Sequence, residues 1–337
     1  YFTTTLKYKI IESTNMNIRK KQPNYKEKTS SISELTKYEF DTFLGLPILS
    51  AIQKDNHLNT REMFDPEYSG NRYKSAMSCE RFNFILECLR FDDPDTREER
   101  KTEDRFTAIR EIWNMFVASC RDLYHPGSYL TIDEQLVGFR GCCLFRMYMP
   151  KKPNKYGIKI VMMCDTQTHY MVDAIPHVGK STYRGLLTLA QYFVLEFTKS
   201  IRGTNRNITT DNWFTSVPLA NELLKPEHKL TLIGTLRKNK TEIPKEIIEF
   251  KKREGTSFFC FDGAKTLVSY QTKPSQSIIL LSTCHKNPAI DKNSKKPEII
   301  ESYNATKGAV DALDQMCGNT SCSQKTKRWP LCIFSTF

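Results

Sequence analysis

The chain has 337 residues, of which 39% are hydrophobic, and its 50 Lys and Arg against 38 Asp and Glu give a formal net charge of +12. This length and apolar content exclude a wholly disordered chain and allow two or three domains. No apolar run is long enough to cross a bilayer and no secretory signal pattern is present, which argues against a membrane-spanning or secreted protein. The basic balance favours a polyanionic partner such as nucleic acid.

The cysteines also argue for an intracellular protein. The chain has eleven of them, an odd number, and no Cys-x-x-Cys pair of the kind that holds zinc. We therefore interpret them as reduced thiols.

The first 30 residues differ in composition from the rest of the chain. Residues 1–30 carry seven Lys or Arg against two Glu and show little apolar periodicity. This pattern predicts a mobile basic leader, whose charges are either simply solvated or in loose contact with DNA.

A helical domain is predicted over residues 31–126. A first helix that starts near Ser33 is expected to be interrupted at Gly45 and Pro47. Ser78 is a typical cap for a second helix, which has its own apolar face. The last predicted helix of this part repeats apolar residues at helical spacing: Phe106, Ile109, Trp113, Phe116, Val117 and Cys120.

The periodicity changes from helical to strand-like near residue 127, where a second domain is expected to begin. Short turns join its first three strands, which predicts an antiparallel meander. Helices are expected before and after the fourth strand, and another follows the fifth. This βββαβαβ order, completed by a helix, is predicted for residues 127–240 and 301–316. The five expected strands are Leu130–Leu136, Ile158–Cys164, Tyr170–Ile175, Arg206–Asp211 and Leu230–Leu236.

A β-rich insertion domain is predicted over residues 241–300, between the fifth strand and the final helix. It contains three short β patterns, Ser257–Phe261, Thr266–Tyr270 and Ser277–Ser282. Residues 317–337 return to polar and basic character, and we expect them to help complete the helical domain.

Four aspartates are the candidate metal ligands. Asp133 lies within the first strand, where a carboxylate loses hydration and needs a cation, hydrogen bonds or a raised pKa. Asp211 ends the fourth strand, and Asp311 and Asp314 share one face of the last helix, where like charges repel unless they are neutralised. Oxygen ligands from two strands and a helix are what two hard cations require. Any one of these aspartates, taken alone, is more often a solvated cap or an ion-pair partner.

Basic and aromatic residues alternate between Phe145 and Lys159, a segment without any acid. Cations there can neutralise phosphates and aromatic rings can stack on bases, although a hairpin with a solvated basic face is the alternative. Trp329 also has two interpretations, since it either stacks on an unpaired base or packs in the core. The candidate DNA contacts in these segments and beside the last helix are Lys151, Lys152, Lys155, Lys307, Lys325, Arg328 and Trp329.

Many segments, in order from about Ser75 to Pro330, resemble the piggyBac-type DNA transposases. The matching segments are 88–93, 131–135, 145–159, 208–220, 230–244, 259–263, 304–316 and 321–330. The resemblance implies an α/β fold, with an RNase H-like catalytic core that carries a β-rich insertion and an all-helical domain for DNA binding and dimerisation.

The same resemblance implies the roles of individual residues. Asp133, Asp211 and Asp311 correspond to three catalytic aspartates, with Asp314 as a further acidic position at the same metal site. Arg237 and Lys240 correspond to DNA contacts. The implied cofactor is a pair of Mg²⁺ ions, for which Mn²⁺ can substitute.

The implied reaction is cut-and-paste transposition in the nucleus by a homodimer. It comprises strand cleavage and transfer at transposon ends, with double-stranded DNA as partner and TTAA-type target sites. Two other classes remain as alternatives: a transposase-derived DNA-binding protein or inactive remnant, and an unrelated metal-dependent nuclease. The presence of every aspartate favours a transposase over the first alternative, and the order of the motifs argues against the second.

In the family, further helix and a cysteine-rich zinc-binding region follow the segment that ends here at Phe337. We therefore expect a fragment that binds DNA with weak preference for transposon ends and transposes poorly. We also expect the apolar faces at Phe106, Trp113 and Phe116 to be partly uncovered.

Overall fold

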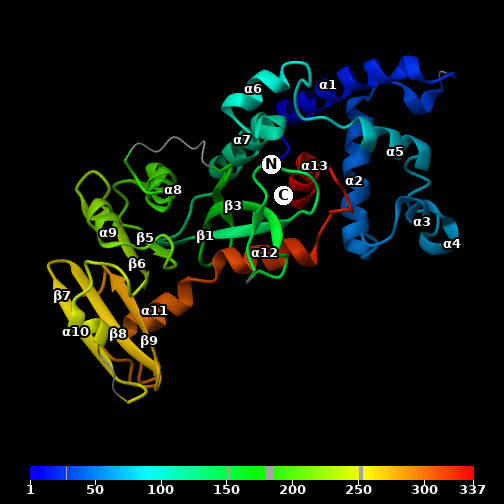
Figure 1. Cartoon of the computed structure of the whole chain (residues 1–337). Helices are drawn as coiled ribbons and strands as arrows, with labels where there is room; N and C mark the ends of the chain where they lie inside the picture. Colours follow the sequence, from blue (N-terminus) through cyan, green and yellow to red (C-terminus); the bar gives the residue numbers. More distant parts are fainter. Residues whose placement is uncertain (28, 151, 180–185, 250–252) are drawn as a thin grey trace.

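The computed structural model describes residues 1–337 except 28, 151, 180–185 and 250–252. Its parts follow one another across the molecule: a helical part, a central sheet flanked by helices, and a three-stranded extension of that sheet (Figure 1). Among the described residues, no helix combines the length and the apolar character needed to cross a membrane.

In the described part of the chain, seven helices and two 3₁₀ turns precede the sheet. Ser78 caps α5 as predicted, because its hydroxyl accepts a hydrogen bond from the Arg81 N–H. The expected break at Gly45 and Pro47 is wrong: α2 continues through both residues, since burial of the flanking apolar residues outweighs the local cost of an internal proline, about 3 kcal/mol. The helices are α1 (Thr4–Lys21), α2 (Lys37–Gln53), α3 (Thr60–Phe64), α4 (Pro66–Ser69), α5 (Cys79–Cys88), α6 (Arg97–Glu103) and α7 (Thr107–Asp122), with the 3₁₀ turns at Gln22–Asn24 and Ser30–Ile32.

The N-terminal segment is not the mobile leader that its charge predicted, because most of it forms α1. One face of α1 is buried through Leu6, Ile10 and Ile18, which belong to the main hydrophobic core. Polar residues on the same helix also have partners: Asn17 donates to the Cys88 carbonyl at 2.9 Å, closing off the end of α5. The basic residues lie on the outer face of α1. The prediction of a mobile leader was based on these charges and overlooked the apolar residues repeated at i and i+4.

The central sheet has the predicted topology. β1 pairs antiparallel with β3, and β3 with β4, which confirms the meander, while β5 pairs parallel with both β1 and β6. The strands are β1 (Tyr129–Gly138), β2 (Met147–Tyr148), β3 (Tyr156–Asp165), β4 (Met171–Pro176), β5 (Asn207–Thr210), β6 (Thr231–Leu236), β7 (Ser257–Asp262), β8 (Lys265–Lys273) and β9 (Gln276–Ser282).

The insertion strands β7, β8 and β9 lie close to their predicted positions, but they do not form a separate sheet. β9 pairs antiparallel with β6, so the strand order β2-β3-β1-β5-β6-β9-β8-β7 runs continuously through the molecule. The extension adds a small apolar cluster of its own, built on Ile233, Val268 and Leu280. Edge pairing to β6 could not be read from the short β patterns, because period-two alternation does not specify the partner strand.

The remaining helices cover the two faces of the sheet. α8 and α9 pack on the face that contains Ile132 and Val161, and α12 packs on the opposite face of β1 (Figure 1). Ser216 caps α9, accepting from the Leu219 N–H. These helices are α8 (Leu189–Thr198), α9 (Val217–Leu224), α10 (Lys245–Glu249), α11 (Glu298–Thr306), α12 (Ala309–Asn319) and α13 (Trp329–Thr336), with a 3₁₀ turn at Lys199–Ile201.

The expectation of uncovered apolar faces on α7 is wrong for Phe106 and Trp113, whereas Phe116 remains partly exposed. α13 packs against that helix, so Phe106 is 0% exposed and Trp113 is 4% exposed. The ring centre of Trp329 lies 5.3 Å from that of Phe106 and 5.0 Å from that of Phe145. The ring centres of Phe337 and Trp113 are 5.2 Å apart. Residues 329–337 therefore complete the helical core locally, and Trp329 takes the packing role of its two interpretations.

Replacing Trp329 by Ala should lower the free energy of unfolding by roughly 2–3 kcal/mol, below the range for fully buried tryptophans because the side chain is half-buried. Denaturant unfolding followed by circular dichroism measures this. Tyr38→Ala is the control, since Tyr38 is 83% exposed. Equal stability of the Trp329 variant and the wild type would contradict the packing role.

Candidate catalytic site

Asp133 lies in the middle of β1, on the strand face opposite Ile132. Its Oδ1 accepts a hydrogen bond from the Glu134 N–H at 2.8 Å. Burial, together with the negative charges of Glu134 and Asp211, raises the pKa of Asp133 to about 8. A carboxylate in this state binds a proton or a cation more readily than one in water.

Asp211 directly follows β5, and the strand register sets its position. Ile132 and Thr210 form the last pair of the parallel β1–β5 ladder. Asp133 and Asp211 are the next residues on the two strands, so they follow that pair at the same position along the sheet. The Asp211 side chain accepts from the Trp213 N–H at 2.8 Å, an Asx turn that leads toward α9. Burial and the charge of Glu134 raise the pKa of Asp211 as well.

A glycine in β6 allows this turn to form. Gly234 pairs with Thr210, and a Cβ at Gly234 would overlap both the Thr210 carbonyl and the Thr215 hydroxyl. The Thr215 hydroxyl in turn donates to the Asp211 carbonyl at 2.7 Å. The missing side chain therefore permits the close approach that holds Asp211 at the strand end.

Asp311 and Asp314 come from α12, which packs on β1. Asp311 lies in the first turn of the helix, where the helix dipole favours an acid, and its side chain is 70% exposed. Lys152 bridges it to β1: its Nζ lies 3.8 Å from Asp311 Oδ1 and donates to the Glu134 carbonyl at 3.1 Å. Asp314 Oδ1 accepts from Gln135 Nε2 at 2.6 Å.

Hydrogen bonds to the end of α11 fix how the acidic helix approaches the strands. The Thr131 hydroxyl of β1 donates to the Thr306 carbonyl, and the Thr209 hydroxyl of β5 donates to the Thr306 hydroxyl at 2.8 Å. Thr131 and Thr209 are both almost fully buried. Both β1 and β5 are therefore hydrogen-bonded to Thr306, immediately before α12.

Asp133 and Asp211 interact electrostatically, but the carboxylate oxygens of the four aspartates are not gathered around one point. Among the described residues, the only three His, Cys, Asp or Glu side chains whose ligand atoms lie within 4.8 Å of one another are Glu222, Glu227 and His228, near the end of α9. Glu222 there already pairs with Lys225 at 2.7 Å. A pair of ions does not require all ligands around one point, because each ion can take its own subset.

The donor chemistry at the aspartates fits a hard divalent cation. Asp133, Glu134 and Asp211 supply carboxylate oxygens only, the ligand type preferred by Mg²⁺ and Mn²⁺. Glu134 Oε2 is buried and has no hydrogen-bond partner among the described residues. This oxygen has the Lys159 ammonium 3.7 Å away, and a divalent cation would stabilise it further.

Lys159 and Glu134 were not predicted as site residues. Lys159 ends the basic and aromatic segment for which a solvated face was considered, yet it is buried, with its Nζ 3.7 Å from Glu134 Oε2 and 3.9 Å from the Trp213 ring centre. Burial lowers the pKa of Lys159, and the charges of Glu134 and Asp211 oppose that shift. The available signal was a lone lysine inside the apolar run of β3.

Several predicted DNA contacts lie beside the aspartates. Arg237 follows β6 and donates from Nε to Asn212 Oδ1 at 3.2 Å, next to Asp211. Lys240 closes the same turn through its N–H, which donates to the Arg237 carbonyl at 3.2 Å. Lys152 and Lys155 line a cavity of about 360 Å³ that also includes Asp314, and exposed Lys307 donates to Asn304 just before α12.

Other predicted contacts are placed differently. Lys151 lies outside the described residues. Lys325 is exposed, in the segment between α12 and α13. Arg328 donates from its guanidinium to the carbonyls of Leu86 and Leu89 at the end of α5, so its first role is to close a helix end rather than to contact a ligand.

Three antiparallel strands, two further parallel strands and a following acidic helix form the RNase H-like arrangement, here with aspartates on adjacent strands. This is the class of fold found in DNA transposases, and similarity to known proteins agrees with it. The family model described as "Transposase IS4" covers residues 2–337, and the chain therefore belongs to that family.

Known proteins similar to this chain are of the piggyBac type. The human piggyBac transposable element-derived protein 3 is 25% identical over 318 residues, covering 88% of this chain and 52% of that protein. The human chimeric ERCC6-PGBD3 protein is also 25% identical over 318 residues, and the match covers 88% of this chain and 29% of that protein. The chain thus spans about half or less of the length of these relatives. The cryo-EM structure of a piggyBac transposase synaptic complex with hairpin DNA matches with a TM-score of 0.95 and 46% identity, over 99% of this chain and 70% of that one.

Asp133→Asn should stabilise the metal-free protein at high pH. Because the pKa of Asp133 is about 8 in the folded chain and about 4 when unfolded, the folded state binds the proton more tightly, and the free energy of unfolding falls as pH rises between these values. In EDTA, the variant should therefore have a higher melting temperature than wild type above about pH 8 and nearly the same one at or below about pH 4. Exposed Asp122→Asn is the control; a pH-independent shift would contradict the assignment.

Proposed function

We propose that the chain carries the catalytic core of a cut-and-paste DNA transposase, which cleaves a DNA strand at transposon ends and transfers it to TTAA-type target sites. The observation that carries this proposal is the pairing of β1 with β5, which brings Asp133 and Asp211 together beside the acidic helix α12. The similar piggyBac transposase structure is described as a synaptic complex with hairpin DNA. Double-stranded DNA is accordingly the partner that we assign.

In this reaction a water or a 3′-hydroxyl attacks a DNA phosphate in line, without a covalent protein intermediate. Two divalent ions, Mg²⁺ or Mn²⁺, would stabilise charge on the attacking and leaving oxygens. Asp133, Asp211 and Asp311 would hold these ions, with Asp314 close by and positioned by Gln135. Arg237 would bind a phosphate at the entrance of the site, because its guanidinium is exposed and anchored beside Asp211 through Asn212.

Lys159 contributes to the same site without contacting solvent. Its buried ammonium lies near Glu134 and Asp211 and offsets part of their mutual repulsion. The strands can therefore stay paired before ions or DNA arrive. A DNA-binding descendant that lacks the reaction has no chemical need for this desolvated acidic arrangement, which supports the catalytic assignment over that alternative.

Assembly and location follow from the same proposal. Cleavage and joining of two transposon ends are best served by two active sites, so we assign a homodimer on DNA, acting in the nucleus. Light scattering of the chain with and without end duplexes tests the dimer. A monomer in both conditions would contradict it.

The direct test of the proposed reaction is cleavage of an end-labelled duplex that contains a terminal inverted repeat beside TTAA. The purified chain should produce a nick with Mg²⁺ or Mn²⁺ and none with EDTA. Equal product in EDTA, or no product although the duplex is bound in the presence of either ion, would contradict the assignment.

Asp311→Asn should reduce cleavage at least a hundredfold while leaving DNA affinity within about twofold, because it removes a metal ligand and no phosphate contact. Gel assays of cleavage and fluorescence anisotropy of a labelled duplex measure the two effects. Glu298→Gln, in the preceding helix α11, is the matched control and should cleave normally. Wild-type cleavage by the Asp311 variant would exclude this residue from the site.

Arg237→Ala combined with Lys240→Ala should weaken DNA binding and lower the slope of log K against log salt by roughly one for each phosphate that the protein no longer neutralises. Lys199→Ala with Arg202→Ala removes the same charge from a remote exposed turn and serves as control. Both pairs should melt at the wild-type temperature. Identical salt slopes for the two double variants would remove Arg237 and Lys240 from the interface.

A further inference from the structure

The row of residues that contains Asp133 and Asp211 continues onto a third strand. β6 pairs in parallel with β5, and Gly234 of β6 stands beside Thr210, the last residue of β5. Thr235 therefore has the same position on β6 that the two aspartates have after the β1–β5 ladder. Because paired residues on neighbouring strands point to the same face of a sheet, Thr235 lies on the face of Asp133.

Helix α11 brings a tyrosine to this row. α11 runs from the three-stranded extension toward α12 (Figure 1), and Thr306 at its end is hydrogen-bonded to β1 and β5. Tyr303 lies one turn earlier on the same side of the helix. Its hydroxyl approaches the Thr235 side chain closely enough for a hydrogen bond. The phenol therefore faces the end of the row that begins with the aspartates.

The charges of the aspartates act on this hydroxyl. Burial raises the pKa of Tyr303, and the hydrogen bond with Thr235 opposes that shift, as a hydroxyl that donates to the phenolic oxygen does. The negative charges of Asp211 and Asp133 raise the pKa further. Tyr303 is therefore a neutral phenol near pH 7, with its proton available for an acceptor in the site.

The ring of Tyr303 is fixed by contacts that do not involve the hydroxyl. It packs against the small apolar cluster that includes Ile233 and Ile299. The exposed Lys307 ammonium lies 5.4 Å from the ring centre. A phenylalanine ring could make both contacts, so packing alone gives no reason for a hydroxyl at this half-buried position.

We infer that Tyr303 is a further catalytic residue, whose hydroxyl donates a hydrogen bond to a non-bridging oxygen of the phosphate that is cleaved. The inference rests on the proposed function, because a phosphate held at Asp133 and Asp211 is the acceptor that comes within its reach. Negative charge on the non-bridging oxygens must be stabilised in the transition state of phosphoryl transfer. A donor already fixed by packing stabilises this charge without reorganisation.

The first test is single-turnover cleavage of the end-labelled duplex with Mg²⁺. Tyr303→Phe should slow cleavage about tenfold to a hundredfold, because it removes one preorganised donor and keeps the ring. Duplex affinity, Mn²⁺ binding and melting temperature should match the wild type. Tyr270→Phe is the matched control, since it removes a hydroxyl next to the same apolar cluster and should cleave at the wild-type rate.

Each outcome of this test has a distinct meaning. A wild-type cleavage rate for Tyr303→Phe overturns the inference alone. A slower rate accompanied by a lower melting temperature or weaker Mn²⁺ binding shows a structural role and also overturns it. A wild type that binds the duplex but does not cleave it overturns the proposed function together with the inference.

The second test places sulfur at each non-bridging oxygen of the cleaved phosphate in turn. Sulfur accepts hydrogen bonds more weakly than oxygen, and Mn²⁺ is used here because it tolerates a sulfur ligand better than Mg²⁺ does. One of the two stereoisomers should slow the wild type by a factor about five times larger than the factor by which it slows Tyr303→Phe, because the variant has no hydrogen bond left to lose. Equal factors in the two proteins for both stereoisomers would overturn the inference.

Discussion

The structure depends on the partial burial of negative charge where β1 and β5 lie side by side. Burial and neighbouring negative charge raise the pKa of Asp133 and of Asp211, and removing even one ionised carboxylate from water costs several kcal/mol when it is unpaired. The buried ammonium of Lys159 offsets only part of this cost. The rest remains as an affinity for cations, which is the property that a metal-dependent phosphoryl transfer site requires.

The surrounding fold keeps these charges together. Parallel pairing sets Asp133 and Asp211 at the same level, Gly234 lets the turn after β5 approach β6, and Thr306 ties the acidic helix to both strands. The helical part shares one continuous hydrophobic core with the opposite face of β1 and β3. The helical part and the strands that carry Asp133 and Asp211 are therefore joined through packed side chains rather than through a flexible linker.

Much of this arrangement could be predicted from the sequence, because it depends on local patterns. Alternation in β1, the apolar run of β3, the cap at Ser78 and the helical spacing around α12 all specify their elements without tertiary information. The incorrect predictions share one cause. Charged residues and proline were interpreted as signs of surface or irregular structure, although they lie in segments that pack against the rest of the molecule. Basic residues on the outside of α1 suggested disorder, Pro47 suggested a helix end, and Lys159 suggested a solvated surface. In each case burial against a distant segment decided the outcome.

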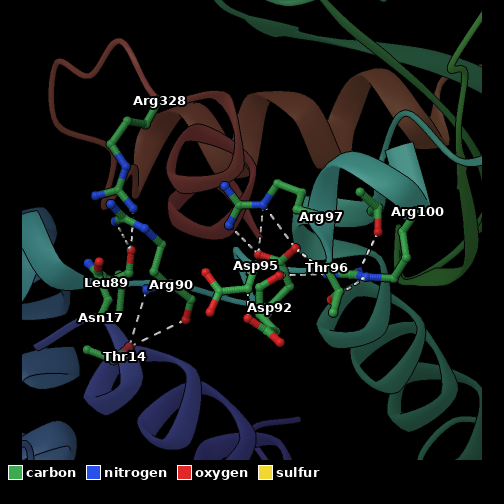
Figure 2. Close-up of polar contacts among 12 residues, drawn as sticks. Thr14, Asn17, Leu89, Arg90, Asp92, Asp95, Thr96, Arg97, Arg100 and Arg328 are labelled. Atoms are coloured by element: carbon green, nitrogen blue, oxygen red, sulfur yellow. Dashed lines mark hydrogen bonds and ion pairs between the residues drawn. The ribbon is translucent and has the colours of Figure 1, made fainter. Parts of the chain in front are cut away.

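Individual site residues were predictable only when their type was unusual for their position. An aspartate within a buried strand stands out, whereas Arg328 reaches the Leu89 carbonyl (Figure 2) from a distant segment whose proximity no periodicity encodes. The pairing of β9 with β6 was equally unpredictable, since the residue pattern of a strand does not specify which strand it pairs with. Long-range contacts of this kind had to be seen in the structure.

The central claim is that the half-buried aspartates are a divalent-metal site. Titration of the chain with Mn²⁺, followed by electron paramagnetic resonance of the free ion, tests it most directly because it requires neither DNA nor turnover. The account predicts that wild type binds Mn²⁺ and that Asp133→Asn and Asp211→Asn each lose most of that binding, whereas Glu222→Gln retains it. Equal Mn²⁺ binding by wild type and both aspartate variants would contradict the account.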